Sequence, residues 1–281
     1  MTLDDSMSLV DIHSHLVPGV DDGARHVPGV LNAIERMTHA GIRRVVTTPH
    51  IDASLVLTPE RLEARLDGVT QAWEQARSAI REEFPEVEYL RGHEVLIDIP
   101  EPDLSDSRLR LTGTSFVLIE WPRLQVPPGT PRVVRHICDQ GYRPIIAHPE
   151  RYAGMMHKTE LPHQWKEAGA RLQVNYGSLA GRYGSEAQAV AWRILGLGLA
   201  DYLASDFHGQ SRLKIYKKET WAELEERGGQ EALDLLFRVN PARVLEDVEP
   251  LPVPAVSAPS PLLQRLRGMI VRRERSMERQ G

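Results

Sequence analysis

Residues 9–15, with the sequence LVDIHSH, contain the pattern that decides the fold. A short run of strand-forming residues ends in two histidines, and six more short runs follow along the chain, separated by longer segments with helical spacing. Strands that alternate with helices are typical of βα units around a parallel sheet. We expect strands at Leu9–Ile12, Arg44–Thr48, Glu88–Arg91, Phe116–Glu120, Pro144–Ala147, Arg171–Val174 and Tyr202–Ala204. Seven such strands predict an α/β barrel.

The segments between these strands predict helices on the outside of the sheet. Pro28–Ala40 has apolar residues near helical spacing, and Pro59–Glu83 begins directly after Thr58, which we expect to cap it. A chain of 281 residues that is 41% hydrophobic can bury one large core. We therefore expect a single barrel domain over residues 1–248.

The composition changes after residue 248. Residues 251–261, with the sequence LPVPAVSAPSP, hold four prolines, so we expect a linker at residues 249–261. Residues 262–281 combine apolar residues at helical spacing with six arginines, which indicates a basic amphipathic tail. Such a tail would contact an acidic kinase segment or an anionic membrane surface, and a solvated end is the alternative.

Charge and apolar patterning argue against several classes of protein. The formal net charge of −5 gives no overall attraction for nucleic acid, so we expect none as a partner. No apolar stretch reaches about 18 residues, and the first residues do not resemble a signal peptide, so we expect a cytoplasmic protein. The single cysteine, Cys138, can form neither an intrachain disulfide nor a thiolate zinc cluster.

Histidines and acids gather at the ends of the predicted strands, which is the edge that carries the active site in βα barrels. A lone histidine or glutamate there is more often a hydrogen-bonded structural residue, but nine together indicate a site. The nine are His13, His15 and Asp22 after the first strand, His50 after the second, Glu94 after the third, Glu120 at the end of the fourth, His148 after the fifth, and Asp206 and His208 after the seventh.

This set of residues predicts metal-ion chemistry. Residues i and i+2 of a strand point the same way, so His13 and His15 can bind one ion, and Asp206 and His208 repeat the arrangement. Imidazoles and carboxylates without thiolate favour zinc, manganese or iron at a hydrolytic centre over a structural zinc site. The set is also too large for one ion.

Seven short motifs occur in order along the chain: DIHSH at 11–15, DDG at 21–23, TPH at 48–50, GHE at 92–94, IE at 119–120, AHPERY at 147–152 and SDFH at 205–208. Together they resemble the PHP (polymerase and histidinol phosphatase) superfamily. Within it, HSHLVPGVDDGA, AHPERY and QVNYGSLAG at 173–181 are similar to the CpsB/CapC-type bacterial tyrosine-protein phosphatases of capsule and exopolysaccharide clusters. The resemblance covers about residues 9–245.

The resemblance implies a distorted (β/α)7 barrel of PHP type that holds three divalent ions, manganese first, with iron or zinc as alternatives. Asp21 is expected to support the site or the local structure rather than bind metal. Matched residue by residue, the first ion is held by His13, His15, Glu94 and Asp206, the second by His50, Glu94 and His148 with Glu94 bridging, and the third by Asp22, Glu120 and His208.

The charge of such a centre suits phosphate. Three divalent ions and four carboxylates leave about +2, from +6 and −4, and a metal-bridging hydroxide reduces this to about +1, which attracts a phosphate dianion. Arg151 and Arg212 could each donate two parallel hydrogen bonds to phosphate oxygens, and ordinary surface arginines are the alternative. Residues 175–181 either shape the same rim or form only a turn and a helix start.

The sequence therefore predicts a metal-dependent phosphoester hydrolase in which a metal-bridging hydroxide attacks phosphotyrosine, with a bacterial tyrosine kinase of capsule or exopolysaccharide synthesis as the substrate. The alternatives are a phosphatase for a small molecule such as histidinol phosphate, and a metal-binding regulator without catalysis. A cysteine nucleophile is disfavoured, because four residues rather than five separate Cys138 from Arg143 and because Cys138 lies in a predicted helix.

Overall fold

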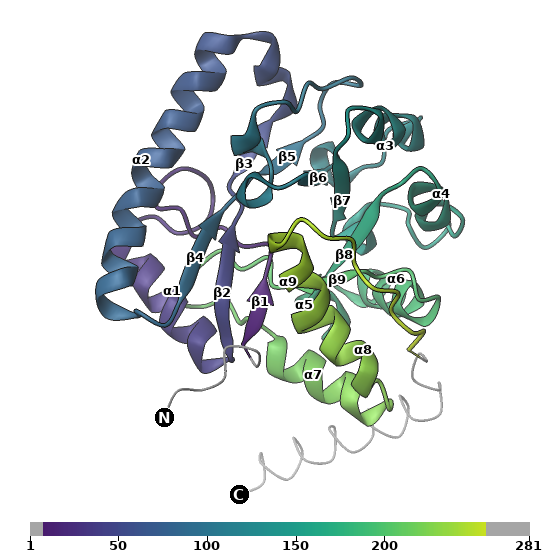
Figure 1. The fold of residues 1–281 in the computed structure, drawn as a ribbon. Helices are drawn as coiled ribbons and strands as arrows, with labels where there is room; N and C mark the ends of the chain where they lie inside the picture. The colour runs from purple at the N-terminus through teal and green to yellow at the C-terminus, as the bar shows by residue number, and fades with distance from the viewer. Residues whose placement is uncertain (1–7, 257–281) are drawn as a thin grey trace, which may run out of the picture.

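The computed structural model describes residues 8–256, in which strands and helices alternate (Figure 1). The strands are β1 (Leu9–Asp11), β2 (Ile42–Thr47), β3 (His50–Asp52), β4 (Glu88–Arg91), β5 (Glu94–Leu96), β6 (Phe116–Glu120), β7 (Arg143–Ala147), β8 (Arg171–Asn175) and β9 (Tyr202–Ala204). The α-helices are α1 (Val27–His39), α2 (Pro59–Glu83), α3 (Thr130–Asp139), α4 (Leu161–Glu167), α5 (Tyr176–Leu179), α6 (Ser185–Gly196), α7 (Lys217–Glu226), α8 (Gln230–Asp234) and α9 (Asn240–Leu245). Within the described range, none of the helices combines the length and apolar character needed to cross a lipid bilayer.

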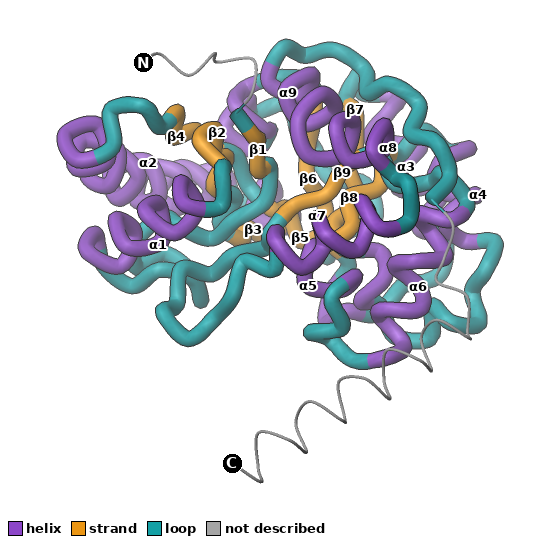
Figure 2. The backbone as a smooth tube through the Cα atoms, turned by 90° about the horizontal axis from the view of Figure 1, so that it is seen from below, coloured by secondary structure: helices purple, strands orange, loops and turns teal. Residues whose placement is uncertain are grey.

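Two parallel sheets form a distorted barrel. Their strand orders are β1-β2-β4 and β3-β5-β6-β7-β8-β9. The β2–β4 and β3–β5 ladders share one register, so β3 continues the line of β2 and β5 continues the line of β4. On the other side, a parallel bridge joins Ser14 to Phe207, which brings the segments after β1 and β9 together. The predicted α/β fold with seven strand positions is confirmed, and Figure 2 shows the strands in the middle with helices around them.

The second and third strand positions are interrupted rather than ended where the sequence predicts their ends. Pro49 has no amide hydrogen for a ladder, and a Cβ added at Gly92 would lie 2.9 Å from Cα of Leu111. Beyond these points the backbone resumes pairing. His50 and Glu94 follow β2 and β4, as predicted, and each is also the first residue of a further short strand, β3 and β5 respectively.

Side chains alternate between the inside and the outside of the barrel. In β6, Phe116 and Leu118 belong to an inner apolar cluster, whereas Val117 and Ile119 belong to the large outer cluster shared with the helices. Because residues i and i+2 share a face, Glu120 lies on the inner face at the carboxyl end of its strand. The alternation that places apolar side chains inside the barrel therefore also places a polar side chain at the carboxyl end of β6.

The two predicted helices are present. The helix predicted at Pro28–Ala40 is α1, which starts and ends one residue earlier, and α2 has the predicted bounds. The predicted cap of α2 is wrong in one detail, because the Thr58 side chain forms no capping hydrogen bond there.

Residues 249–256 contain neither helix nor strand, as their prolines predict, yet they lie against the barrel. The amide of Leu251 donates to Oδ1 of Asn240 at 2.8 Å, and the amide of Val256 donates to the carbonyl of Leu195 at 3.0 Å. Val256 itself is buried. This part of the predicted linker is therefore attached to the barrel; its remainder and the predicted tail at 262–281 lie outside the described residues.

Candidate metal centre

The nine residues predicted from the strand ends converge at one end of the barrel. Each has a side-chain atom within 3.5 Å of another member of the set. His13 and His15 are fully buried. The His15 ring packs against the rings of His208 and His50, with centroid distances of 4.2 and 4.5 Å. Five imidazoles and four carboxylates thus form one cluster.

Glu94 lies at the centre of this cluster. Its Oε2 is 3.1 Å from Nε2 of His13, 3.3 Å from Nε2 of His15 and 3.2 Å from Nδ1 of His50. Its Oε1 is 2.9 Å from Nε2 of His148. The two oxygens of one carboxylate therefore face imidazoles on both sides, which is the arrangement that a bridging ligand requires.

One group of ligand atoms has the spacing of a metal site. Nε2 of His13 and Nε2 of His15 are 3.3 Å apart, and Oδ1 of Asp206 is 3.6 and 3.5 Å from them. Metal–ligand bonds of about 2.1 Å in a tetrahedral site place neighbouring ligand atoms about 3.4 Å apart. Together with Oε2 of Glu94, these atoms fit one divalent ion.

A second group surrounds the other side of Glu94. Oε1 of Glu120 is 3.1 Å from Nδ1 of His50, and Oε2 of Glu120 is 3.9 Å from Nε2 of His148. The resemblance placed Glu120 with Asp22 and His208 instead. The geometry brings Glu120 to the histidines of the second group.

A third group lies at the exposed edge of the cluster. Oδ1 of Asp22 is 3.3 Å from Nε2 of His208 and 3.6 Å from Nε2 of His50. The Asp22 side chain is 69% exposed, whereas that of Glu94 is 1% exposed. Asp22 therefore lies at the solvent-exposed edge of the cluster, and Glu94 lies in its buried interior.

Atoms without partners support the fit of this donor set to metal ions. Within the described residues, Oε2 of Glu94 and Nδ1 of His50 are buried and form no hydrogen bond. A buried carboxylate oxygen without a donor costs free energy, because it has lost its hydration. A cation between these atoms would remove that cost.

The electrostatics of the cluster also favour cations. Burial lowers the pKa of His13, but the carboxylates of Glu94 and Asp206 outweigh burial and raise this pKa to about 9. Burial raises the pKa of both carboxyl groups, but the neighbouring imidazoles, His13 first, bring each pKa well below its usual range. Both carboxylates therefore stay ionised at neutral pH.

A chain of three hydrogen bonds orients two of the predicted ligands. His13 Nδ1 lies 2.8 Å from Oε1 of Gln173, whose Nε2 donates to Oδ1 of Asn175 at 2.9 Å. Nδ2 of Asn175 in turn donates to Oδ2 of Asp206 at 2.8 Å. The chain returns to His13 across the 3.6 Å contact with Oδ1 of Asp206.

The donor and acceptor atoms of each side-chain amide fix the direction of the next hydrogen bond. Because Gln173 donates through Nε2, its Oε1 must accept the proton on Nδ1 of His13, which leaves Nε2 of that imidazole free to bind an ion. Asn175 likewise occupies one oxygen of Asp206 and leaves the other toward the imidazoles. The sequence placed Asn175 in the segment 175–181 that could shape the rim, but it predicted for neither amide a contact with a metal ligand. The signal was present, since Gln173 and Asn175 are polar residues at alternate positions of a strand with an apolar outer face.

Asp21 supports a different ligand, in line with its predicted role. Its Oδ2 lies 2.8 Å from Nδ1 of His15, and its Oδ1 accepts from the amide of Gly23 at 3.0 Å. Burial raises the pKa of Asp21, but the contact with His15 outweighs it and lowers this pKa to about 2. Asp21 is thus an ionised acceptor that holds the Nδ1 edge of the His15 ring.

Two predicted ligands have an unusual backbone conformation. His148 has φ of 34° and Asp206 has φ of 49°, in the left-handed region that residues other than glycine seldom adopt. Such residues cost about 1–3 kcal/mol each and cluster at functional sites. The strained backbone of these two residues is therefore consistent with a functional role for both side chains.

Arg151 lies at the edge of the cluster. Its Nη1 donates to Oδ2 of Asp206 at 2.5 Å, and its guanidinium stacks over the ring of Tyr183 with 4.3 Å to the centroid. Within residues 8–256, its Nε and Nη2 groups have no acceptor. The sequence did not single out Tyr183, which holds Arg151 from one face.

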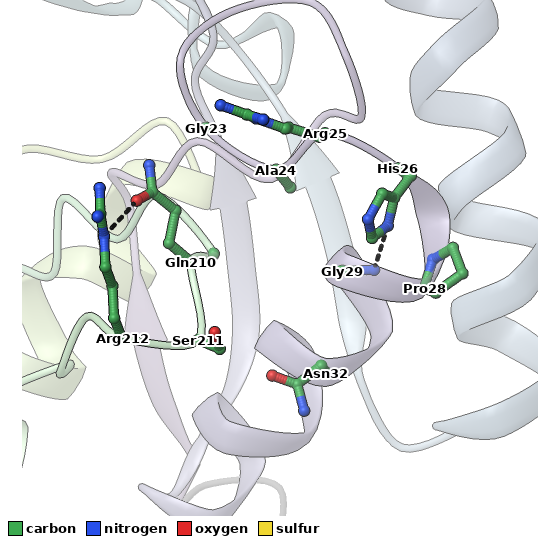
Figure 3. A pocket seen from close by; sticks show the side chains of 11 residues that line it. Gly23, Ala24, Arg25, His26, Pro28, Gly29, Asn32, Gln210, Ser211 and Arg212 are labelled. Carbon is green, nitrogen blue, oxygen red and sulfur yellow. Dashed lines mark hydrogen bonds between the residues drawn. The ribbon is translucent and has the colours of Figure 1, made fainter.

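Arg212 and Cys138 lie in different surroundings. Arg212 is exposed on the loop after His208, where its Nε donates to Oε1 of Gln210 at 3.2 Å (Figure 3). Cys138 is in α3, as predicted, and a Cβ added at Gly169 would approach its sulfur to 2.7 Å. Burial raises the pKa of this thiol, which disfavours the nucleophilic thiolate.

The family model of capsular polysaccharide synthesis proteins CpsB/CapC matches residues 9–246. The chain belongs to the CpsB/CapC family. This confirms the resemblance that the ordered motifs predicted. The matched range contains all nine residues of the metal-binding cluster. It also contains Arg151, Arg212, Gln173 and Asn175.

Several relatives of the CpsB/CapC family are described as tyrosine phosphatases. The tyrosine-protein phosphatase YwqE of Bacillus subtilis is 30% identical over 226 residues, which cover 79% of this chain and 86% of YwqE. The putative tyrosine-protein phosphatase CapC of Staphylococcus aureus is 24% identical over 229 residues, which cover 80% and 87%. The tyrosine-protein phosphatase CpsB of Streptococcus pneumoniae is 24% identical over 253 residues, which cover 85% and 99%.

Solved structures agree with the CpsB/CapC assignment. A chain from the crystal structures of YwqE from B. subtilis and CpsB from S. pneumoniae, which are described as unique metal-dependent tyrosine phosphatases, matches with a TM-score of 0.74 and 27% identity. This match covers 89% of the present chain and 99% of that one. A mutant organophosphorus hydrolase matches with a TM-score of 0.50 and 16% identity over 85% and 93%, and shares the fold alone.

Proposed function

We propose that this chain is a metal-dependent phosphoric monoester hydrolase that removes phosphate from tyrosine in proteins. The proposed substrate is a bacterial tyrosine kinase of capsule or exopolysaccharide synthesis. The names of the CpsB/CapC relatives support the reaction, and the family description supports the setting. The kinase itself is our extension.

The observation that carries this proposal is the position of Glu94. A single buried carboxylate faces four imidazoles at 2.9–3.3 Å, and one of its oxygens has no hydrogen-bond donor among the described residues. The imidazoles keep this carboxylate ionised, but its buried Oε2 lacks a hydrogen-bond donor within residues 8–256, which costs free energy. A set of bridged divalent ions accounts for it.

We assign the residues to three ions, with manganese as the first choice. His13, His15, Glu94 and Asp206 would hold the first ion. His50, His148 and Glu94 would hold the second, and the contacts of Glu120 with both histidines favour a place for it there. Asp22 and His208 would hold the third, with His50 close to both.

The residues of the chain perform separate tasks around a phosphate. Bound divalent ions would supply Lewis acidity and lower the pKa of water to about 7. Arg151 is fixed by Asp206 and Tyr183, so its remaining donors can bind phosphate oxygens without losing much side-chain entropy. Gln173 and Asn175 keep two ligands oriented while charge changes around them.

Three phosphate esters distinguish the candidate functions. Manganese-loaded protein is incubated with a phosphotyrosine peptide, the matched phosphoserine peptide and histidinol phosphate, and the release of phosphate is measured for each. We expect kcat/KM for the phosphotyrosine peptide to exceed both others by at least about 10-fold, which is about 1.4 kcal/mol of preferential transition-state binding.

Each other outcome favours a different function. Faster hydrolysis of histidinol phosphate would assign the chain to small-molecule metabolism. Tight manganese binding without hydrolysis of any ester would indicate a regulator. Either result would refute the proposed tyrosine phosphatase.

A further inference from the structure

A pocket lies directly beside the metal-binding cluster. It has a volume of about 540 Å³ and opens between the segment that leads into α1 and the loop after β9 (Figure 3). Pockets of about 300–1,000 Å³ are large enough for small ligands or a short peptide segment.

The pocket adjoins the proposed metal ligands through the chain itself. Gly23 in its wall follows Asp22, and Gly209 in the opposite wall follows His208. Nε2 of Gln210, also in the wall, donates to the carbonyl of Asp22 at 3.4 Å. A group bound here would therefore lie next to a substrate at the cluster.

The walls of the pocket are fixed. A Cβ added at Gly209, which has φ of 66°, would lie 2.9 Å from Cδ2 of Leu16 and 3.2 Å from Cβ of Ala24. Arg36 of α1 donates through Nη1 to the carbonyl of Gln210 at 3.2 Å and also bonds the carbonyl of Leu213. The loop is thus held against α1, and the pocket exists before a ligand binds.

The charge of the pocket has one sign. Arg25 and Arg212 line it from the two segments that form its walls, and its lining residues include no aspartate or glutamate (Figure 3). Arg25 is exposed and has neither a hydrogen-bond acceptor nor an ion-pair partner within residues 8–256. Two arginines in a lining that includes no aspartate or glutamate favour an anionic ligand.

We infer that this pocket binds the peptide segment that flanks the phosphotyrosine, with an aspartate or glutamate side chain between Arg25 and Arg212. The inference rests on the proposed function and adds a sequence preference to it. Phosphate at the metal centre and carboxylate at the two arginines would fix an extended peptide at two points. The preference arises in binding, so it changes KM more than kcat.

The test compares three phosphotyrosine peptides of equal length. One has glutamates on both sides of the phosphotyrosine, the second has glutamines at the same positions, and the third has a second phosphotyrosine in place of one glutamate. For the manganese-loaded wild-type protein we expect kcat/KM about 3- to 10-fold higher for the glutamate peptide than for the glutamine peptide, as two solvent-exposed ion pairs allow. The ratio should fall as salt is added.

Variants of Arg25 assign the preference to the pocket. Arg25→Ala should lower the ratio of kcat/KM for the glutamate peptide to that for the glutamine peptide to the value expected for one ion pair. Arg25→Glu should reverse this preference, and Arg25→Lys should keep most of it. Arg135→Ala on α3 is the matched control, because Arg135 is also exposed but does not line the pocket, and it should keep the wild-type ratio.

Equal kcat/KM for the glutamate and glutamine peptides, or a preference that survives Arg25→Glu, would overturn the inference and leave the phosphatase proposal intact. A preference for the doubly phosphorylated peptide alone would show that the pocket takes phosphate rather than carboxylate. If none of the peptides is hydrolysed, the proposed function fails and the inference fails with it.

Discussion

Replacement of Glu94 by alanine should remove more metal from the protein than replacement of Asp22. Glu94 has both oxygens within 3.3 Å of imidazoles from two groups of ligands, whereas Asp22 lies at the exposed edge, 3.3 Å from His208 and 3.6 Å from His50. If Glu94 bridges two ions, Glu94→Ala deprives both of a ligand, and Asp22→Ala deprives one.

The size of the effect follows from ligand number. A structural zinc ion bound by four ligands contributes about 10–16 kcal/mol, or about 2.5–4 kcal/mol for each ligand. Loss of one ligand should therefore weaken an ion about 10²- to 10³-fold. Glu94→Ala should lose about two ions after dialysis against micromolar manganese, and Asp22→Ala should lose about one.

The assay is elemental analysis of the dialysed variants together with thermal unfolding, which establishes that each is folded. Glu94→Gln is the matched variant, since it keeps the side-chain volume and one of the two oxygens, and we expect it to retain more metal than Glu94→Ala. Equal losses from Glu94→Ala and Asp22→Ala in folded protein would refute the bridging role.

Variants at three further positions test other parts of the site. Cys138→Ser should leave phosphatase activity within about 2-fold of the wild type, because the thiol lies in α3 with a raised pKa; a loss of most turnover in folded protein would overturn the metal-based reaction. Arg151→Ala should lower kcat and kcat/KM by about 10²-fold with normal metal content, and Arg151→Lys should restore little because lysine lacks the planar fork; normal kinetics would assign Arg151 to the surface. Gln173→Met should weaken manganese binding by about 10- to 100-fold, since it removes the acceptor for Nδ1 of His13; unchanged affinity, measured by calorimetry, would show that Gln173 serves packing alone.

The strand positions and the cluster at their ends could be predicted because both follow from local patterns. Alternation in β6 places Phe116 and Leu118 inside the barrel, and the same period brings Glu120 to the polar end. His13 and His15 follow a strand in the same way. Residues whose position follows from the alternation within one strand can be recognised from that segment of sequence alone.

Other features depend on contacts between distant segments. The sequence could not show that Glu120 approaches His50 and His148, because that contact is set by the curvature of three strands rather than by spacing. The hydrogen bond from His13 to Gln173 spans 160 residues, and no local pattern encodes it. The strand starts at Glu94 and His50 were missed for a similar reason, since pairing resumes only when the neighbouring strand is in place.

The most direct test of the metal-based account is a manganese titration of protein that has been stripped with a chelator. Phosphate release from a phosphotyrosine peptide is measured after each addition, and bound metal is counted in the same samples. We expect almost no activity in stripped protein and a return of activity that is complete when about three ions are bound. Full activity in stripped protein, or complete activity with a single ion bound, would contradict it.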